Sequence, residues 1–434
     1  MNRVFPKMIF AGLALLVALA ACAPAAPQPL LPNVTSTVQP PLAEPNSAYP
    51  GSQGDTNSQG YPAPQASPTS AAPTTAPTIE PTAMPTEATP LVIELPAPWV
   101  SYIGADENLW IINPDKGEMR QITQDAQPFQ PGVVNIVYCC GVWSGDGKYM
   151  AYSRQVGTPV AEGYNYDFGL WVFDLDTGQS REVVADQQIA TFSWQPGTHN
   201  LTYGLSIPNE YFSMHQVDSN FATGIWSLDV DTGAASELVP PSNGFLLVNP
   251  IWSPDGRYVG FDEVYQMEGR GNFAYFDVAA AEYYPWNKAI GGYRWSQDGE
   301  LLYYDYLTYA PSGTERIFRN TRHNSEEQQI SPEAANTIHF SPLLTPDGSQ
   351  VIYIAEEMLG EGNSRYQFMI QPTAGGDART LGEFVQPGEL SISSDGRLLL
   401  FSAGPWDSRQ IQMITLADGS VRSMVQGKQP VWQR

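Results

Sequence analysis

The ten residues WSPDGRYVGF at positions 252–261 belong to a pattern that returns along the chain. Close copies are WSGDGKYMAY at 143–152, WQPGTHNLTY at 194–203 and WSQDGELLYY at 295–304, and weaker copies are LTPDGSQVIY at 344–353 and ISSDGRLLLF at 392–401. Taken in chain order, the first residues of the six copies are 51, 58, 43, 49 and 48 positions apart. A repeat of this period indicates an array of similar structural units.

Each copy has the features of a strand, a tight turn and a second strand, because its Asp-Gly pair favours a turn and an apolar run follows. A second half-pattern comes later in each repeat, for example LWVFDLDTG at 170–178 and IWSLDVDTG at 225–233. Two hairpins in succession make a four-stranded antiparallel meander, which is the blade of a β-propeller.

Both ends of the repeat region indicate how such a ring would close. Residues 99–102, 109–112 and 119–122 have the character of strands two, three and four of a blade, and residues 429–432 that of a first strand. We therefore predict an all-β fold over residues 97–434, a seven-bladed β-propeller closed by its N- and C-terminal strands.

The Trp-Ser-Pro-Asp-Gly repeat resembles the WD-like repeat of TolB-type β-propellers, and the resemblance covers about residues 97–434. That family includes periplasmic scaffolds that bind other envelope proteins, and also the propeller halves of prolyl-oligopeptidase-type enzymes. In those enzymes an α/β-hydrolase domain carries the chemistry, and no such domain is expected here. The resemblance therefore implies a fold and only weakly a function.

The N-terminal region has the features of an exported lipoprotein. A basic tip precedes the apolar run Met8–Ala21, and Leu19–Cys22 resembles a bacterial lipobox, which implies removal of residues 1–21 and lipidation of Cys22. The alternative is an ordinary signal peptide with a chance cysteine. Residues 22–96 are predicted to be a disordered Pro/Thr/Ser-rich tether, because 18 of the 38 prolines fall between 23 and 98 among few large apolar residues.

The net charge of the chain and the absence of catalytic and nucleotide-binding motifs argue against several classes of function. The net charge of −24 argues against nucleic acid, because phosphate binding needs clustered Lys and Arg. Neither Gly-x-Ser-x-Gly nor Gly-x-x-x-x-Gly-Lys-Ser/Thr occurs, and the Asp-Thr-Gly segments are expected to be hairpin turns rather than calcium loops. We predict no enzyme activity, no cofactor and no metal site.

In a four-stranded blade, one face carries the turns between strands one and two and between strands three and four. The other carries the connections between strands two and three and between blades, and the long, aromatic-rich segments all fall there. The candidate binding face comprises Tyr164, Tyr166, Phe168, Tyr211, Phe212, His215, Phe221, Tyr265, Tyr306, Tyr309, Tyr366 and Trp406. The alternative is that these aromatic side chains fold inward as small cores of their own loops.

Several residues are candidates for chemistry. The histidines at 199, 215, 323 and 339 have no ligand spacing, and His339 is placed best for the channel, although a structural role is preferred for it. Cys139 and Cys140, expected at the start of the first strand of a blade and near the channel mouth, form either a vicinal disulfide or two buried thiols. A lyase would need His, Arg and a carboxylate together, for which Arg294, His339 and Glu389 are candidates.

The function predicted from these features is that of a surface-exposed, non-enzymatic lipoprotein, extracytoplasmic and anchored to the bacterial membrane by its lipid. Its partner would be another cell-envelope protein bound by the aromatic and acidic face. The alternatives are a carbohydrate-binding or lyase-like propeller and a spacer without a specific ligand.

Overall fold

The computed structural model describes residues 98–433, except 162, 186, 207–221, 243, 266–270 and 309–313. The predicted signal peptide, Cys22 and the tether lie outside the described residues, as do Tyr211, Phe212, His215, Phe221 and Tyr309. The described residues form strands and turns but no α-helix. Accordingly, none of them belongs to a helix long and apolar enough to span a membrane.

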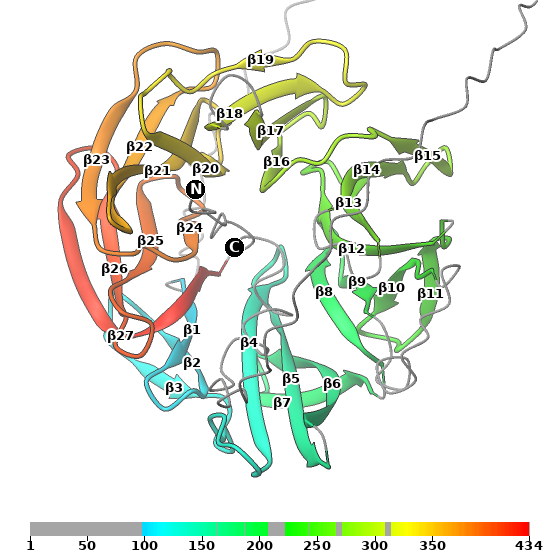
Figure 1. Cartoon of the computed structure of the whole chain (residues 1–434). Coiled ribbons are helices and arrows are strands. Elements are labelled where there is room, and N and C mark those ends of the chain that lie inside the picture. The colour runs from blue at the N-terminus through cyan, green and yellow to red at the C-terminus, as the bar shows by residue number, and fades with distance from the viewer. Residues whose placement is uncertain are drawn as a thin grey trace, which may run out of the picture. The chain divides into compact units, whose positions relative to one another are not determined.

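Five four-stranded antiparallel sheets and one seven-stranded sheet surround a common centre (Figure 1), which is the arrangement of a β-propeller. The first three four-stranded sheets are β4 (Asn135–Trp143), β5 (Tyr149–Val160), β6 (Gly163–Asp174) and β7 (Gln179–Val184); β8 (Ile189–Trp194), β9 (Asn200–Leu205), β10 (Ile225–Asp229) and β11 (Ala235–Val239); and β12 (Phe245–Trp252), β13 (Tyr258–Tyr265), β14 (Asn272–Asp277) and β15 (Glu282–Pro285). The other two are β16 (Tyr293–Trp295), β17 (Leu301–Thr308), β18 (Thr314–Thr321) and β19 (Gln328–Gln329); and β20 (Thr337–Leu344), β21 (Gln350–Gly360), β22 (Asn363–Pro372) and β23 (Arg379–Phe384).

The seven-stranded sheet joins the two ends of the described chain. Its strands are β24 (Leu390–Ile392), β25 (Leu398–Ala403), β26 (Gln410–Thr415), β27 (Val421–Trp432), β1 (Val100–Gly104), β2 (Leu109–Ile112) and β3 (Met119–Gln121), in that order across the sheet. The first half of β27 pairs with β26, up to Gln410↔Gln426, and its second half pairs with β1, from Gly104↔Gly427 to Val100↔Trp432. Figure 1 shows β27, in red, running from the outer edge towards the centre.

The recurring Ser-x-Asp-Gly sequence, with Thr for Ser in one copy, has a structural reason in the turns that carry it between the first two strands of a sheet. In the β4–β5 turn, the Ser144 hydroxyl donates to Asp146 Oδ1 at 2.6 Å and accepts the Tyr149 N–H at 3.0 Å. Gly147 has a φ of 72°, which a residue with a Cβ adopts at a cost. Equivalent bonds recur from Ser253, Ser296, Thr345 and Ser393 to the aspartate two residues later.

Two of the tryptophans that open a strong repeat, Trp194 and Trp295, fasten their sheets to the preceding ones. The indole N–H of Trp194 donates to the Val142 carbonyl at 2.9 Å, and that of Trp295 donates to the Ile251 carbonyl at 3.0 Å. In each case the acceptor stands directly before the tryptophan of the preceding sheet. Each ring therefore fills the space between two sheets and fixes their spacing.

Two segments that the sequence suggested to be loops are extensions of strands. The β5–β6 ladder continues to Val160↔Gly163, beyond the point where β4 and β7 stop pairing with it. The β21–β22 ladder likewise continues to Gly360↔Asn363. Both extensions form two-stranded hairpins because an antiparallel pair can continue alone when its neighbours end.

Candidate functional site

Because neighbouring strands are antiparallel, their connections alternate between the two ends of each sheet. We call the side with the Asp-Gly and Asp-Thr-Gly turns the turn face. The loop face carries the connections between the second and third strands of each sheet and the links between sheets. On the turn face, the carboxylates of Asp174 and Asp229 each accept two backbone N–H groups of their own turns, as expected for hairpin turns.

Exposed large apolar side chains are concentrated on the loop face. Eight of the ten found among the described residues lie there, and only Met119 and Val421 lie towards the turn face. The eight are Val133, Val134, Val160, Tyr265, Met358, Leu359, Val385 and Trp406. This distribution makes the loop face the candidate binding surface of the described residues.

The two extended hairpins stand on either side of the seven-stranded sheet, as the ring order in Figure 1 shows. Val160 lies at the tip of the β5–β6 hairpin, and Met358 and Leu359 lie at the tip of the β21–β22 hairpin. Between them the seven-stranded sheet has only short connections on this face, and one of these, joining β25 to β26, presents Trp406 with 56% of its surface exposed. Val160 on one side and Met358 with Leu359 on the other therefore flank the sheet that carries the exposed Trp406.

Trp406 lies beside two cations. The Lys428 ammonium is 4.6 Å and the Arg409 guanidinium 5.1 Å from the centre of its ring. Lys428 also bonds to both carboxylate oxygens of Glu107, at 2.6 and 2.9 Å, and Arg409 donates to the Ser402 hydroxyl at 3.1 Å. These contacts hold the indole in place while leaving more than half of it open to a ligand.

Of the predicted face residues that the structure describes, only Tyr265 and Trp406 are exposed. Phe168 is buried in the core between the sheets, so its assignment to a binding surface was wrong; alternation along β6 turns it inward. Tyr166 and Tyr366 pack partly against core clusters. The hydroxyl of Tyr164 bonds to the backbone of Gln130 and Gly132, and the Lys288 ammonium lies 3.9 Å from the centre of the Tyr306 ring.

Cys139 and Cys140 form a disulfide in the middle of β4, which begins four residues before the pair. The placement at the start of a strand was therefore wrong. Cys139 is buried, Cys140 is half-buried, and Cys140 has a φ of 66°.

His339 is buried in β20, and its ring centre lies 5.1 Å from that of Tyr353. Burial lowers the pKa of His339 to about 4, and the nearby Arg316 charge acts in the same direction. Arg294 donates to the Tyr293 carbonyl at 2.7 Å, and Glu389 is exposed in the link before β24. Among the residues with described positions, no three His, Cys, Asp or Glu side chains are grouped so that they could hold a metal ion.

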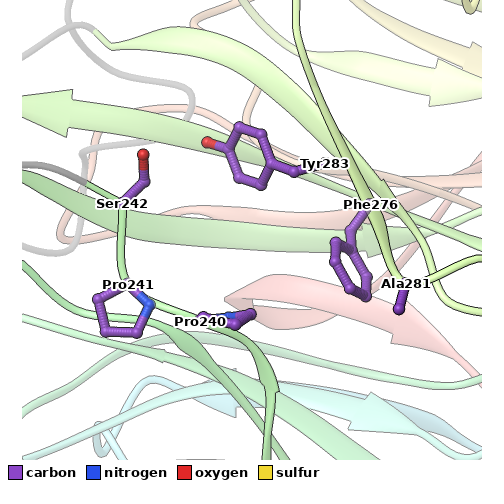
Figure 2. Close-up of a pocket in the computed structure, with 6 residues that line it drawn as sticks. All are labelled: Pro240, Pro241, Ser242, Phe276, Ala281 and Tyr283. Atoms are coloured by element: carbon purple, nitrogen blue, oxygen red, sulfur yellow. The ribbon is translucent and has the colours of Figure 1, made fainter.

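A small pocket lies away from the loop-face tryptophan, between the outer strands of the second and third sheets. It has a volume of about 370 Å³ and is lined by Pro240, Pro241, Ser242, Phe276, Ala281 and Tyr283 (Figure 2). The Tyr283 hydroxyl donates to Glu263, which is buried beside it, and burial raises the pKa of Glu263. The lining offers apolar contacts but no charged group.

His199 has partners that sequence spacing could not reveal. Its Nδ1 lies 2.6 Å from Asp231 Oδ2 and its Nε2 lies 2.9 Å from Asp146 Oδ2. The aspartates come from two other turns, 32 and 53 residues away along the chain. The three side chains link two sheets on the turn face.

Comparisons with solved structures identify the architecture. An oligogalacturonate lyase in complex with manganese matches over 76% of this chain and 85% of its own, with 12% identity and a TM-score of 0.53. A structure from a study of two prolyl endopeptidases matches over 73% of this chain and 46% of its own, with 16% identity and a TM-score of 0.54. TolB from Acinetobacter baumannii matches over 75% of this chain and 78% of its own, with 16% identity and a TM-score of 0.44.

No family model matches the chain, and no curated protein matches it. At 12–16% identity, the likeness to these structures concerns the fold alone. The sequence-based expectation of a propeller agrees with it.

Proposed function

We propose that this protein is a non-enzymatic binding protein that recognises another cell-envelope protein through its loop face. The observation that carries the proposal is the concentration of exposed apolar side chains on that face, eight of ten among the described residues. This face includes the two hairpin tips and Trp406. A rigid scaffold that presents apolar groups on extended hairpins suits recognition of a partner.

The proposal includes an extracytoplasmic location and a lipid anchor at Cys22. Its support is the sequence Leu19–Cys22 after an apolar run and the proline-rich segment that follows. In this arrangement residues 1–21 are the signal peptide, residues 22–96 are the tether and residues 97–434 are the propeller.

We also propose that the seven-stranded sheet consists of two blades that share β27, which gives a closed ring of seven blades. Two observations support this count. β27 changes partner from β26 to β1 near its middle. Its second half ends in Trp432, and Gln429, three residues earlier, has a φ of 55°, as Asn249 does three residues before Trp252.

The test compares two double variants that remove apolar side chains of similar exposure from opposite faces. Met358→Ser with Leu359→Ser removes side chains that are 48% and 58% exposed on the loop face, and Met119→Ser with Val421→Ser removes side chains that are 51% and 47% exposed elsewhere. We expect the loop-face variant to lose at least tenfold in crosslinking to its envelope partner in intact cells, since buried anchors at an interface contribute about 1–4 kcal/mol each.

The second pair is the matched control and should crosslink as the unmodified protein does. Both variants should keep the same thermal midpoint, because exposed side chains contribute little to stability. Equal crosslinking by both variants would contradict the choice of face, and no crosslinked protein in any sample would favour the spacer.

A second function has one observation in its favour. Trp406 with Arg409 combines an exposed aromatic ring with a neighbouring cation, a set that suits a carboxylated sugar, whereas Lys428 is already paired with Glu107. The similar lyase is described as acting on oligogalacturonate. A rise in the thermal midpoint with oligogalacturonate, lost in Trp406→Ala, would support carbohydrate binding.

A further inference from the structure

The vicinal cysteines occupy a backbone bulge that the fold repeats elsewhere. The pairing of β4 with β5 shifts in register between Cys139 and Val142, and Cys140 has a φ of 66°. The same shift occurs in β12, β20 and the second half of β27. The residues with positive φ at these bulges are Asn249, Ser341 and Gln429, with φ values of 55°, 56° and 55°.

In all four bulges the residue with positive φ lies three positions before the last paired residue of its strand. These last residues are Trp143 in β4, Trp252 in β12, Leu344 in β20 and Trp432 in β27. At each bulge the residue with positive φ is half-buried and the next residue is buried. Three of the four bulges form without any cysteine. The backbone conformation that places Cys139 beside Cys140 is therefore a property of the propeller and does not depend on a sulfur–sulfur bond.

Side chains of the preceding sheet hold the bulges in place. The Asn249 N–H donates to the Thr191 hydroxyl at 2.6 Å, and the Ser341 N–H donates to Asp305 Oδ2 at 2.9 Å. At the cysteine bulge, the Ser101 hydroxyl donates to the Gly141 carbonyl at 2.7 Å. None of these bonds involves a cysteine side chain.

A disulfide between adjacent residues also adds little to stability by constraint. Disulfides stabilise mainly by closing a loop in the unfolded chain, and the effect grows with the number of residues enclosed. The Cys139–Cys140 bond encloses none. The bond is therefore not needed to form the folded backbone conformation, and it adds little stability by constraining the unfolded chain.

We propose that Cys139–Cys140 is a thiol–disulfide exchange site that is oxidised and reduced while the propeller stays folded. The co-reactant is a dithiol, either a small molecule or a pair of cysteines on another protein. Its thiolate attacks the sulfur of the half-buried Cys140 and forms a mixed disulfide, and the Cys139 sulfur leaves with the electron pair. The second thiolate of the co-reactant then closes its own disulfide and releases Cys140, and the two cysteines take up two protons.

The experiment uses the full chain with Cys22→Ser, which leaves Cys139 and Cys140 as the only cysteines. The protein is incubated with dithiothreitol under native conditions, free thiols are alkylated, and the modified residues are counted by mass spectrometry. We expect complete reduction of the folded protein and recovery of the disulfide when oxidised dithiothreitol is supplied. We expect the reduced form to keep its thermal midpoint within about 3 °C.

The matched control is Cys139→Val with Cys140→Asn, which introduces the residues found at 248 and 249 in the equivalent bulge. It should fold with the same midpoint as the reduced protein and should take up no alkylating reagent. A larger fall in the midpoint on reduction would show that the bond is structural and would overturn the proposal. Resistance of the bond to dithiothreitol until the chain is unfolded would overturn it too. The proposal is independent of the partner proposed for the loop face.

Discussion

At the scale of single residues, His199 links two neighbouring sheets when its ring is protonated, because each ring nitrogen can then donate to an aspartate. A histidine can donate from both ring nitrogens only when it is protonated, and both nitrogens here face carboxylates, those of Asp146 and Asp231. Burial alone would lower the pKa of His199, but the bonds and charges of the two aspartates raise it above its usual value. Lys148 and Tyr149 lie beside the same group, and Tyr149 donates to Asp231 Oδ1 at 2.8 Å.

This arrangement predicts a pH dependence of stability. Because the pKa of His199 is raised in the folded state, its contribution is fully present below the unfolded value of 6.5 and is lost as pH rises through the folded value. The thermal midpoint of the unmodified protein should exceed that of His199→Gln most at pH 5–6.5, and the difference should shrink at higher pH. The lowered pKa of Asp146, about 2, keeps its carboxylate charged over this range.

His323→Gln is the matched control, because the contacts of that ring with the described residues are a 3.4 Å approach of the Tyr275 hydroxyl and edge packing against Tyr284, with no carboxylate among them. Its effect should not change with pH in the same way. A difference between the unmodified protein and His199→Gln that grows with pH would contradict the assignment.

At the scale of elements, the repeated tryptophans predict unequal costs for one substitution. Trp295→Phe removes the indole N–H that bonds to the Ile251 carbonyl, whereas the Trp143 indole N–H is buried with no partner among the described residues. Both rings are almost fully buried, so the loss of ring volume is similar. Trp295→Phe should therefore reduce the free energy of unfolding by about 1 kcal/mol more than Trp143→Phe. Chemical denaturation measures both free energies of unfolding. Equal losses would show that these tryptophans contribute to stability through packing alone.

The elements also show which features the sequence could predict. The Ser-x-Asp-Gly turns depend on residues that are close together in sequence, and the tryptophans recur at the same place in the pattern. The six sequence repeats therefore predicted the sheets that contain them. The hairpin extensions were expected to be loops, because whether a segment pairs beyond its neighbours depends on a partner strand that sequence alone does not align. The same limit placed Phe168 on the surface, and the partners of His199 come from turns far away in sequence.

At the scale of the whole molecule, stability depends on β27, which pairs with both β26 and β1. Trp432 near its end is 3% exposed and packs with Val100 and Tyr102, whereas Val421 at its start is 47% exposed. Trp432→Ala should reduce the free energy of unfolding by about 3–5 kcal/mol, and Val421→Ala should change it by less than about 0.5 kcal/mol. Calorimetry should show one transition in both, shifted in the first. A separate early transition of the seven-stranded sheet alone would contradict a single cooperative unit.

The β1–β27 pairing also bears on how the molecule reaches its native state. The Trp99 N–H bonds to the Gln433 side chain across 334 positions of sequence. Contacts of such high sequence separation form late and slow the search for the native topology. Until Trp432 reaches Val100, β1 keeps an unpaired edge on the side that β27 later covers, and an unpaired edge is prone to association with other chains. A chaperone that binds the incomplete chain would therefore protect this edge from association until β27 has been synthesised.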